Sequence, residues 1–187
     1  MLEEEFIEDL DIDREPTVYE IGDQVVYPHH GAGKVLKKEM KEVLGEKRQY
    51  LTIQILHNNM TVMVPCENAG KAGLRRIIDE DTVKKVLGVL SDDISEMPKN
   101  WNRRFKHNRD KIKTGDILEL AEVVRNLAIR EQDKGLSTGE KQMYTRAKKI
   151  LASELMYALD KTEDEAEAYL DDLLSRTDVE LAAAAAV

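Results

Sequence analysis

The sequence has almost no cysteine, because Cys66 is alone among 187 residues. A single cysteine excludes an intramolecular disulfide and a zinc site built from several cysteines. Long apolar runs are also missing, since none approaches the roughly 20 residues that a membrane-spanning helix needs. The acidic start MLEEEFIEDLDIDREP has neither the basic residues nor the apolar stretch of a secretory signal. These absences predict a cytoplasmic protein without a membrane segment.

Aromatic residues are scarce, at 5% of the chain, although hydrophobic residues make up 42%. Aliphatic side chains must therefore fill most of any core. A chain of 187 residues is long enough for one or two domains, each with a core of its own.

Charge is strongly segregated along the chain, which the net value of −9 conceals. Residues 1–20 carry a net charge of −8 and residues 156–187 one of −7, whereas residues 96–155 carry +5. Because salt screens exposed charges beyond about 8–10 Å, a local patch matters more than the total. A cationic middle between acidic ends predicts an anionic partner for the middle.

Residues with catalytic or metal-binding chemistry form no recognisable site. A metal-dependent enzyme would have to use His29, His30, His57 and Cys66, but adjacent histidines in an extended segment point to opposite faces. Cys66 follows a proline and has no evident base beside it. The stretch Gly31-Ala-Gly33 lacks the lysine and the length of a phosphate-binding loop. The sequence therefore predicts a protein that is not an enzyme and holds neither metal nor cofactor.

The first third of the chain combines an acidic arm with short β-prone runs. Residues 1–19 are rich in carboxylates and are typical of a disordered arm. Four short runs follow, separated by glycine and asparagine turns, at 24–27, 33–39, 49–56 and 61–65. So many short strands in about fifty residues predict a small, strongly bent antiparallel sheet or a partly open barrel.

The remainder of the chain has helical periodicity. We expect a linker over residues 71–78, about five helices over 79–176, and a disordered alanine-rich tail over 177–187. The stretch Ser137-Thr-Gly-Glu140 is a capping box, and it predicts the start of a long helix.

The stretch NWNRRFKHNRDKIK at 100–113 carries the only tryptophan, Trp101. Read as a helix, it places Trp101, Phe105, Asn108 and Ile112 on one narrow stripe. Trp101 lies at the N-terminal end of that stripe, where it can project past the core as a wedge for a nucleic-acid groove. A buried core anchor is the alternative interpretation of Trp101. Cations cover the rest of the helix: Arg103, Arg104, Lys106, Arg109, Lys111 and Lys113.

The long helix after Ser137 offers further cations: Lys141, Arg146, Lys148 and Lys149. Lys141 lies in the first turn, where free backbone N–H groups also favour a phosphate. If this helix neighbours the Trp101 helix, the two form one anion-binding face. The chain has no zinc-finger spacing and no helix rich in base-reading side chains, so we expect contacts with phosphates and groove shape rather than with bases.

Five segments together resemble the CarD/CdnL family of bacterial transcription regulators. They follow the family's order and spacing from about Tyr19 to Leu174: IGDQVVYPHHGAGKV, MTVMVPCENAGKAGLR, NWNRRFK, AEVVRNL and LSTGEKQM. The resemblance implies a Tudor-like domain over residues 20–70, shared with the transcription–repair coupling factor, that docks on the RNA polymerase β subunit. It also implies a helical domain that touches promoter DNA at the upstream edge of the melted bubble.

The resemblance also implies roles for individual residues. The tryptophan matching Trp101 wedges into the minor groove, and the cations matching Arg103, Arg104, Lys106 and Lys141 hold the backbone. Together with Arg109 and Lys148 from the helical pattern, these are the candidate DNA-binding residues. The candidate polymerase-binding residues are Lys41, Val62, Met63 and Pro65. Some relatives carry arginine where this chain has Lys41 and Met63, and the acidic arm is additional to the usual family start.

The fold that we predict is α+β with several domains: a small Tudor-like antiparallel β-barrel, then a compact all-α domain. The predicted function is that of a monomeric transcription factor, associated with the nucleoid through RNA polymerase and its sigma factor. It would stabilise the open promoter complex without reading sequence. The alternatives are a protein–protein adaptor without functional DNA contact and a free-standing DNA-binding protein. For the acidic arm we favour a solvated tail. A further hypothesis is that it competes with DNA for the basic helix, in which case deleting residues 1–15 should tighten DNA binding at low salt.

Overall fold

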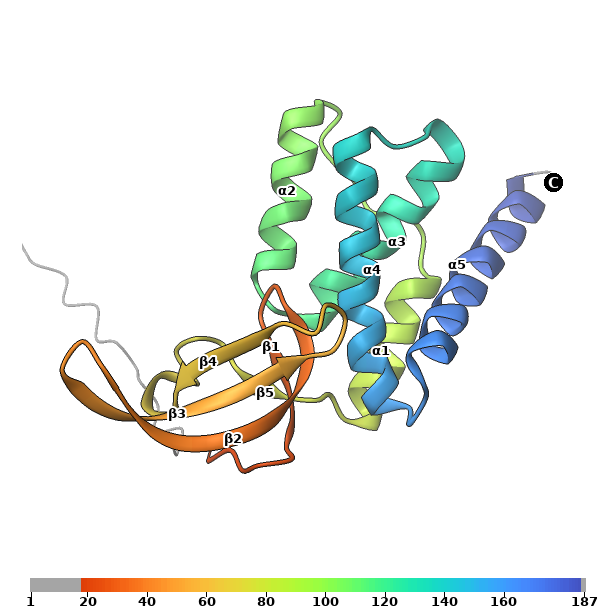
Figure 1. Cartoon of the computed structure of the whole chain (residues 1–187). Coiled ribbons are helices and arrows are strands. Elements are labelled where there is room, and N and C mark those ends of the chain that lie inside the picture. Colours follow the sequence, from red (N-terminus) through yellow and green to blue (C-terminus); the bar gives the residue numbers. More distant parts are fainter. Residues whose placement is uncertain (1–17, 186–187) are drawn as a thin grey trace, which may run out of the picture.

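The computed structural model describes residues 18–185, with side chains described as far as residue 175. An antiparallel sheet is followed by a group of helices, as Figure 1 shows, so the predicted α+β class is confirmed. Most of the predicted arm, residues 1–17, lies outside the described residues. The sheet has the strand order β4-β3-β2-β1-β5. Its strands are β1 (Gln24–Tyr27), β2 (Gly31–Val43), β3 (Glu46–Ile55), β4 (Thr61–Pro65) and β5 (Arg75–Arg76).

The sheet is open, because β4 and β5 are its two edges and do not pair with each other. The predicted barrel is therefore not closed. A register shift between Val35 and Lys37 bends β2, as a β-bulge does. The inner face of the sheet carries its own aliphatic core, which includes Val25, Val35, Leu51, Ile53 and Ile55.

The β2–β3 hairpin extends well beyond the runs that the sequence predicted. Its ladder continues to the pair Val43 and Glu46, across a turn at Leu44 and Gly45, both with positive φ. Residues along this outer part are mostly exposed, and Leu44 is fully so. Alternation of apolar and polar residues fades where a strand leaves the core, which explains why the sequence pattern stopped short.

Five helices form the second part of the molecule. They are α1 (Glu80–Ser91), α2 (Trp101–Lys113), α3 (Ile117–Lys134), α4 (Thr138–Ala158) and α5 (Glu163–Ala185), and a short 3-10 turn at Cys66–Asn68 precedes them. The predicted capping box is confirmed, because Ser137 accepts from the Glu140 N–H and Glu140 accepts from the Ser137 N–H. A second aliphatic core, with Leu127, Leu151, Leu155 and Leu170 among its members, lies between the helices.

Two segments differ from the sequence prediction. The expected linker at 71–78 contains strand β5, in which Arg75 and Arg76 pair with Val26 and Val25 of β1. The expected disordered tail at 177–187 is helical as far as Ala185, in keeping with the high helix propensity of alanine. None of the described helices is long and apolar enough to cross a membrane.

The sheet is fastened to the helices at the C-terminal half of α4 (Figure 1). Arg75 of β5 forms two hydrogen bonds with the carboxylate of Glu154, at 2.6 and 2.8 Å. The Ala32 N–H donates to Ser153 Oγ at 3.0 Å. A Cβ at Gly31, whose φ is +89°, would lie 2.9 Å from the same Ser153 oxygen. This close approach requires glycine and fixes the sheet against α4.

Candidate nucleic-acid interface

Trp101 is the first residue of α2, and it is held in place by three neighbours. Asn100 caps the helix by accepting from the Arg103 N–H at 3.2 Å. The indole stacks on Phe105 with 5.2 Å between ring centroids, and its Nε1 donates to Ser137 Oγ at 2.8 Å. A Cβ at Gly139 would lie 3.6 Å from Trp101 Cζ2, so the indole also lies against the first turn of α4.

The stripe predicted for α2 divides into a buried part and an exposed end. Asn108 is 1% exposed, and Phe105 and Ile112 pack against the helical core. Trp101 is 43% exposed in spite of its hydrogen bond and its stacking partner. The indole therefore projects past the core, and the interpretation of Trp101 as a buried anchor does not fit.

Arg104 differs from the surface cation that the sequence suggested. It is 4% exposed, and its Nε lies 2.7 Å from Glu140 Oε1. Its Nη1 donates to the carbonyls of Pro98 and Lys99, at 3.3 and 2.9 Å. A guanidinium with these partners inside the domain is not available to a phosphate. The helical pattern did not predict this burial. The pattern identifies a buried face mainly by its apolar residues, whereas Arg104 is buried because it forms an ion pair with Glu140.

Glu140 connects α2 with the N-terminus of α4. Its second oxygen accepts from the N–H and the hydroxyl of Ser137, at 3.2 and 2.9 Å. Burial alone would raise the pKa of Glu140, but hydrogen bonds from Arg104 and Ser137 outweigh that effect and lower the pKa. A continuous polar chain thus runs from Arg104 through Glu140 and Ser137 to the indole of Trp101.

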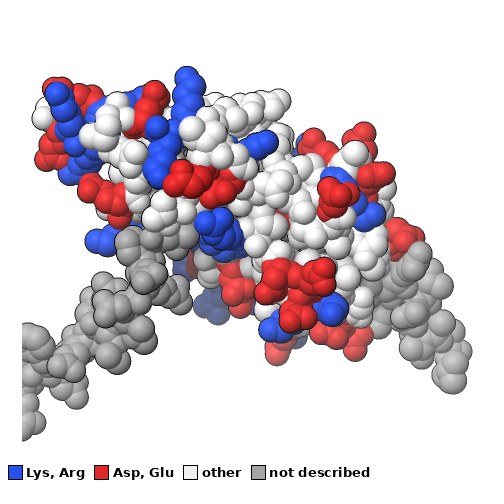
Figure 2. Space-filling model, turned by 90° about the horizontal axis from the view of Figure 1, so that it is seen from below, with Lys and Arg blue, Asp and Glu red and all other residues white. Residues whose placement is uncertain are grey.

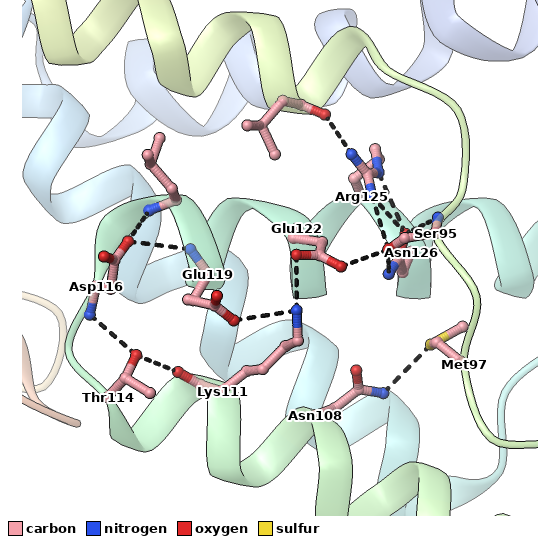
Figure 3. A network of polar contacts seen from close by, with 12 residues as sticks. Ser95, Met97, Asn108, Lys111, Thr114, Asp116, Glu119, Glu122, Arg125 and Asn126 are labelled. Carbon is pink, nitrogen blue, oxygen red and sulfur yellow. Dashed lines mark hydrogen bonds and ion pairs between the residues drawn. The ribbon is translucent and has the colours of Figure 1, made fainter.

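The other side of α2 is fixed to α3 by the polar network of Figure 3. Lys111 donates to Glu122 at 2.7 Å and pairs with Glu119 at 3.0 Å. Burial alone would lower the pKa of Lys111, but these carboxylates raise it. Beside them, Ser95 accepts from Arg125 at 3.0 Å and from Asn126 at 2.8 Å, and it also contacts Glu122. Helix α2 is therefore held by contacts on both sides. Lys111 takes part in ion pairs that stabilise the packing of α2 against α3.

Four of the predicted DNA-binding cations remain on the surface of the region around Trp101. Arg103 is exposed. Lys106 pairs with Asp110 of its own helix at 3.1 Å, and Arg109 lies 3.9 Å from the same carboxylate. Lys141, in the first turn of α4, pairs with Glu131 at 3.2 Å. Exposed pairs of this kind contribute little to stability, so these cations can exchange partners with a phosphate.

Lys148 lies elsewhere. It donates to Asp171 of α5 at 2.7 Å, and α5 lies on the opposite side of α4 from α2 (Figure 1). Burial alone would lower the pKa of Lys148, but the pairing with Asp171 raises it. The structure thus does not bring Lys148 to the region of Trp101. Seen from below, in Figure 2, Lys and Arg are interspersed with Asp and Glu rather than gathered in one patch.

A groove of about 490 Å³ lies between α2 and α4, and its lining includes Phe105 and Gly139, which both lie against the indole. Its apolar lining comes from Phe105, Ile112 and Met143, and its cations come from Arg109, Lys113 and Arg146. His29 closes it, with its carbonyl accepting from Arg146 Nη2 at 2.9 Å. Sequence reasoning did not find this groove, because His29 is 117 residues from Arg146 and only the packing of sheet on helix joins them.

The histidines lie in a cationic environment. Burial first, and then the charges of Lys113 and Arg146, lower the pKa of His29. Burial and Arg146 likewise lower the pKa values of His30 and His57. Among the described residues, no three His, Cys, Asp or Glu side chains are placed to hold a metal ion. Burial raises the pKa of the Cys66 thiol, which makes it a weaker nucleophile at neutral pH.

The four predicted polymerase-binding residues lie on two strands of the sheet. Val62, Met63 and Pro65 belong to β4, an edge strand, and Met63 is 52% exposed. Lys41 of β2 reaches across β3, so that its Nζ lies 3.1 Å from Met63 Sδ. The structure therefore brings Lys41 and Met63 into contact, and an exposed strand edge lies beside them.

Comparison with known proteins matches both parts of the chain. Residues 19–78 match the family model of the CarD-like/TRCF RID domain, and residues 85–171 match that of the CarD C-terminal domain. A Bacillus subtilis (strain 168) protein named "Putative transcription factor YdeB" is 41% identical over 138 residues, which are 74% of this chain and 90% of that protein. A solved structure of CdnLNt from Myxococcus xanthus is 41% identical and covers 34% of this chain and 90% of its own, with a TM-score of 0.29.

Proposed function

The chain belongs to the CarD/CdnL family, and on this premise we propose that it is a non-enzymatic bacterial transcription factor. It binds the β subunit of RNA polymerase through its sheet. It stabilises the open promoter complex by contacting the DNA minor groove at the upstream edge of the bubble. The polymerase and its sigma factor select the promoter, so the protein itself needs no sequence code.

The position of Trp101 is the observation that carries this proposal. A large aromatic side chain is 43% exposed, yet it is fixed by stacking on Phe105 and by a hydrogen bond to Ser137. An inserting wedge works best when it is rigid before it meets DNA, since then no conformational freedom is lost on binding. Apolar and aromatic wedges of this kind open a base step from the minor groove.

The cations around Trp101 supply the contact with the DNA backbone. Arg103, Lys106, Arg109 and Lys141 are available to phosphates, and Lys141 lies in the first turn of α4, where the helix dipole also favours an anion. Such contacts are independent of DNA sequence, and their affinity falls as salt increases. For each phosphate contact, log K decreases by roughly 0.9 for every tenfold rise in salt concentration. In this scheme Arg104 supports the site from inside, and Lys148 does not take part.

The sheet provides the tether to the polymerase. The edge strand β4, with Met63 beside Lys41, is the contact surface, and we infer that the sheet is a Tudor-like module. A tethered protein reaches DNA at a high effective concentration, so weak intrinsic affinity is sufficient. The protein acts as a monomer in the cytoplasm and associates with the nucleoid through the polymerase.

The test is the lifetime of open complexes formed by purified bacterial RNA polymerase and sigma factor. Three conditions are compared: no factor, the wild-type chain and Trp101→Ala. We expect the wild-type chain to lengthen the lifetime and the folded variant to lose that effect while still binding polymerase. A variant that lengthens the lifetime as much as the wild type would contradict the wedge.

An adaptor without functional DNA contact is the second candidate, and the β2–β3 hairpin favours it. The apolar side chains of Met40 and Leu44 are exposed on this hairpin. Exposed apolar side chains are typical of protein–protein interfaces. Charge reversal of Arg103, Lys106 and Lys141 separates the two functions. An adaptor keeps its effect on transcription, whereas a DNA-contacting factor loses it.

A further inference from the structure

The first 17 residues of the chain are both acidic and apolar, and the proposed function gives them no role. Within MLEEEFIEDLDIDREPT, eight carboxylates accompany a single cation, Arg14. Five apolar side chains are interspersed among them: Leu2, Phe6, Ile7, Leu10 and Ile12. These residues lie outside the described part of the chain. A segment that is both acidic and apolar binds best to a surface that is both basic and apolar.

The groove between α2 and α4 is such a surface. Its base is formed by Phe105, Ile112 and Met143, and its rim carries Arg109, Lys113 and Arg146. No carboxylate is among the residues that line it. At about 490 Å³ it has room for a few side chains of a peptide.

Two of the three rim cations, Lys113 and Arg146, differ from most other cations of the two helices in their partners. The third, Arg109, lies 3.9 Å from the carboxylate of Asp110. Lys106, Lys111 and Lys141 each form an ion pair with a carboxylate. Within the described residues, Lys113 and Arg146 form no such ion pair, and the guanidinium of Arg146 donates only to the carbonyl of His29. The groove therefore holds positive charge that the rest of the described chain leaves uncompensated.

The segment is long enough to reach the groove. The carbonyl of Val18, where the described chain begins, accepts from Arg76 at 3.3 Å, and Arg76 pairs with Val25 of β1. His29, at the groove, follows Val25 by four residues, which span at most about 13 Å. Leu10, the last of the apolar residues that we place on the groove, precedes Val18 by eight residues, and eight residues span at most about 26–29 Å when fully extended. Docking therefore requires the residues between Leu10 and Val18 to be extended.

We propose that the groove between α2 and α4 is the docking site of the chain's own residues 1–17. Phe6, Ile7 and Leu10 cover the apolar base, and the surrounding carboxylates pair with Lys113 and Arg146. Because the groove adjoins Trp101, the docked segment occupies space that DNA needs. This last consequence rests on the proposed function, whereas the docking itself does not.

The docking is measured without DNA or polymerase. A fluorescein-labelled peptide of residues 1–17 is titrated into the chain that begins at Val18, and its anisotropy gives a Kd. We expect saturable binding, at least tenfold weaker for the double variant Lys113→Glu, Arg146→Glu. The matched control, Lys47→Glu with Lys84→Glu, changes the net charge equally at exposed positions outside the groove lining and should bind like the parent. Circular dichroism checks that each variant is folded.

A second peptide separates docking from simple charge attraction. Replacing Phe6, Ile7 and Leu10 with serine leaves every carboxylate in place, and we expect binding to fall at least tenfold. Equal binding of the two peptides, equal binding to the two double variants, or no binding at all would overturn the proposal. The oligomeric state of the full-length chain and of the chain that begins at Val18 is also compared. If the full-length chain is a dimer and the shorter chain is a monomer, the segment binds a second copy, and docking within one chain is overturned.

The consequence for DNA follows from the peptide Kd. A segment on a short flexible tether has an effective concentration of about 1 mM, so a peptide Kd of about 0.1–1 mM predicts a two- to tenfold rise in DNA affinity on its removal. If the peptide binds the groove but removal of residues 1–17 does not change the DNA affinity, the docking site stands and the competition with DNA is contradicted. A failure of the open-complex test would leave the peptide result untouched.

Discussion

The indole Nε1 of Trp101 donates a 2.8 Å hydrogen bond to Oγ of Ser137, the residue that caps helix α4. A single hydroxyl thus begins one helix and orients an exposed aromatic side chain at the start of another. The same hydroxyl contacts Glu140, whose other oxygen is paired with the buried Arg104. The orientation of the indole therefore depends on the packing of α2 against α4 and not on α2 alone.

Replacing Trp101 with alanine should affect function more than stability. The indole is partly exposed and outside the core, so we expect a loss of about 1 kcal/mol, the range of an aromatic pair. Open complexes should decay as fast as they do without the factor. Chemical denaturation and the lifetime assay measure the two effects. A loss of several kcal/mol would instead make Trp101 a structural residue.

Two substitutions of Ser137 separate its two roles. Ser137→Ala removes the cap and the acceptor for the indole, and it should lower the free energy of unfolding by about 0.5–2 kcal/mol. Ser137→Gly should cost only a few tenths of a kcal/mol, because glycine is tolerated at this position. Both variants free the indole, so both should shorten the open-complex lifetime. If Ser137→Gly has the wild-type lifetime, the hydrogen bond does not orient the wedge.

The Arg104–Glu140 pair should behave as a buried structural pair. Removing Glu140 leaves the buried Arg104 without a carboxylate, and removing Arg104 leaves the buried Glu140 with Ser137 and with Arg130 at 4.0 Å. We expect each alanine variant to lose about 3–5 kcal/mol. Arg103→Ala, the neighbouring exposed residue, is the matched control and should stay within about 0.5 kcal/mol of the wild type. Urea unfolding measures all three. Similar stability of Arg104→Ala and Arg103→Ala would contradict the buried pair.

Stability should fall in mildly acidic solution because of the histidines. Burial and nearby cations lower the folded-state pKa values of His29, His30 and His57, whereas the unfolded value is about 6.5. Below pH 6.5 the unfolded chain therefore binds more protons, and the free energy of unfolding decreases as pH falls. Urea unfolding at pH 7.5, 6.5 and 5.5 measures the slope. His57→Gln should make it shallower, and an unchanged slope would exclude His57 as a contributor.

Glu154 should be required for the attachment of the sheet to the helices. Its carboxylate accepts two bonds from Arg75 and one from the Ile78 N–H at 3.1 Å. Glu154→Gln weakens the pair, and we expect a loss of about 1.5–3 kcal/mol because the half-buried guanidinium of Arg75 loses its charged acceptor. Cleavage by trypsin near Arg75 and Arg76 should become faster. Exposed Glu96→Gln, in the loop between α1 and α2, is the control and should leave both measurements unchanged.

Local chemistry made several elements predictable from the sequence. The capping box at Ser137 and the stripe through Phe105 and Asn108 rely on neighbours within one or two helical turns, so residue spacing is sufficient. The alternation in 49–56 likewise identified strand β3. Two-residue strand β5 has no such pattern, and it forms only because β1 offers an edge.

The sequence by itself determined an α+β chain, the Trp101 helix and the segregation of charge, because these depend on composition and on short-range spacing. Only the tertiary structure decided which cations are free. Arg104 and Glu140, Lys148 and Asp171, and Arg146 and His29 are distant in sequence, and each pairing arises from how elements pack. A helical pattern gives the face on which a residue lies, whereas burial and pairing depend on what lies opposite. That is why the groove between α2 and α4 was absent from every pattern in the sequence.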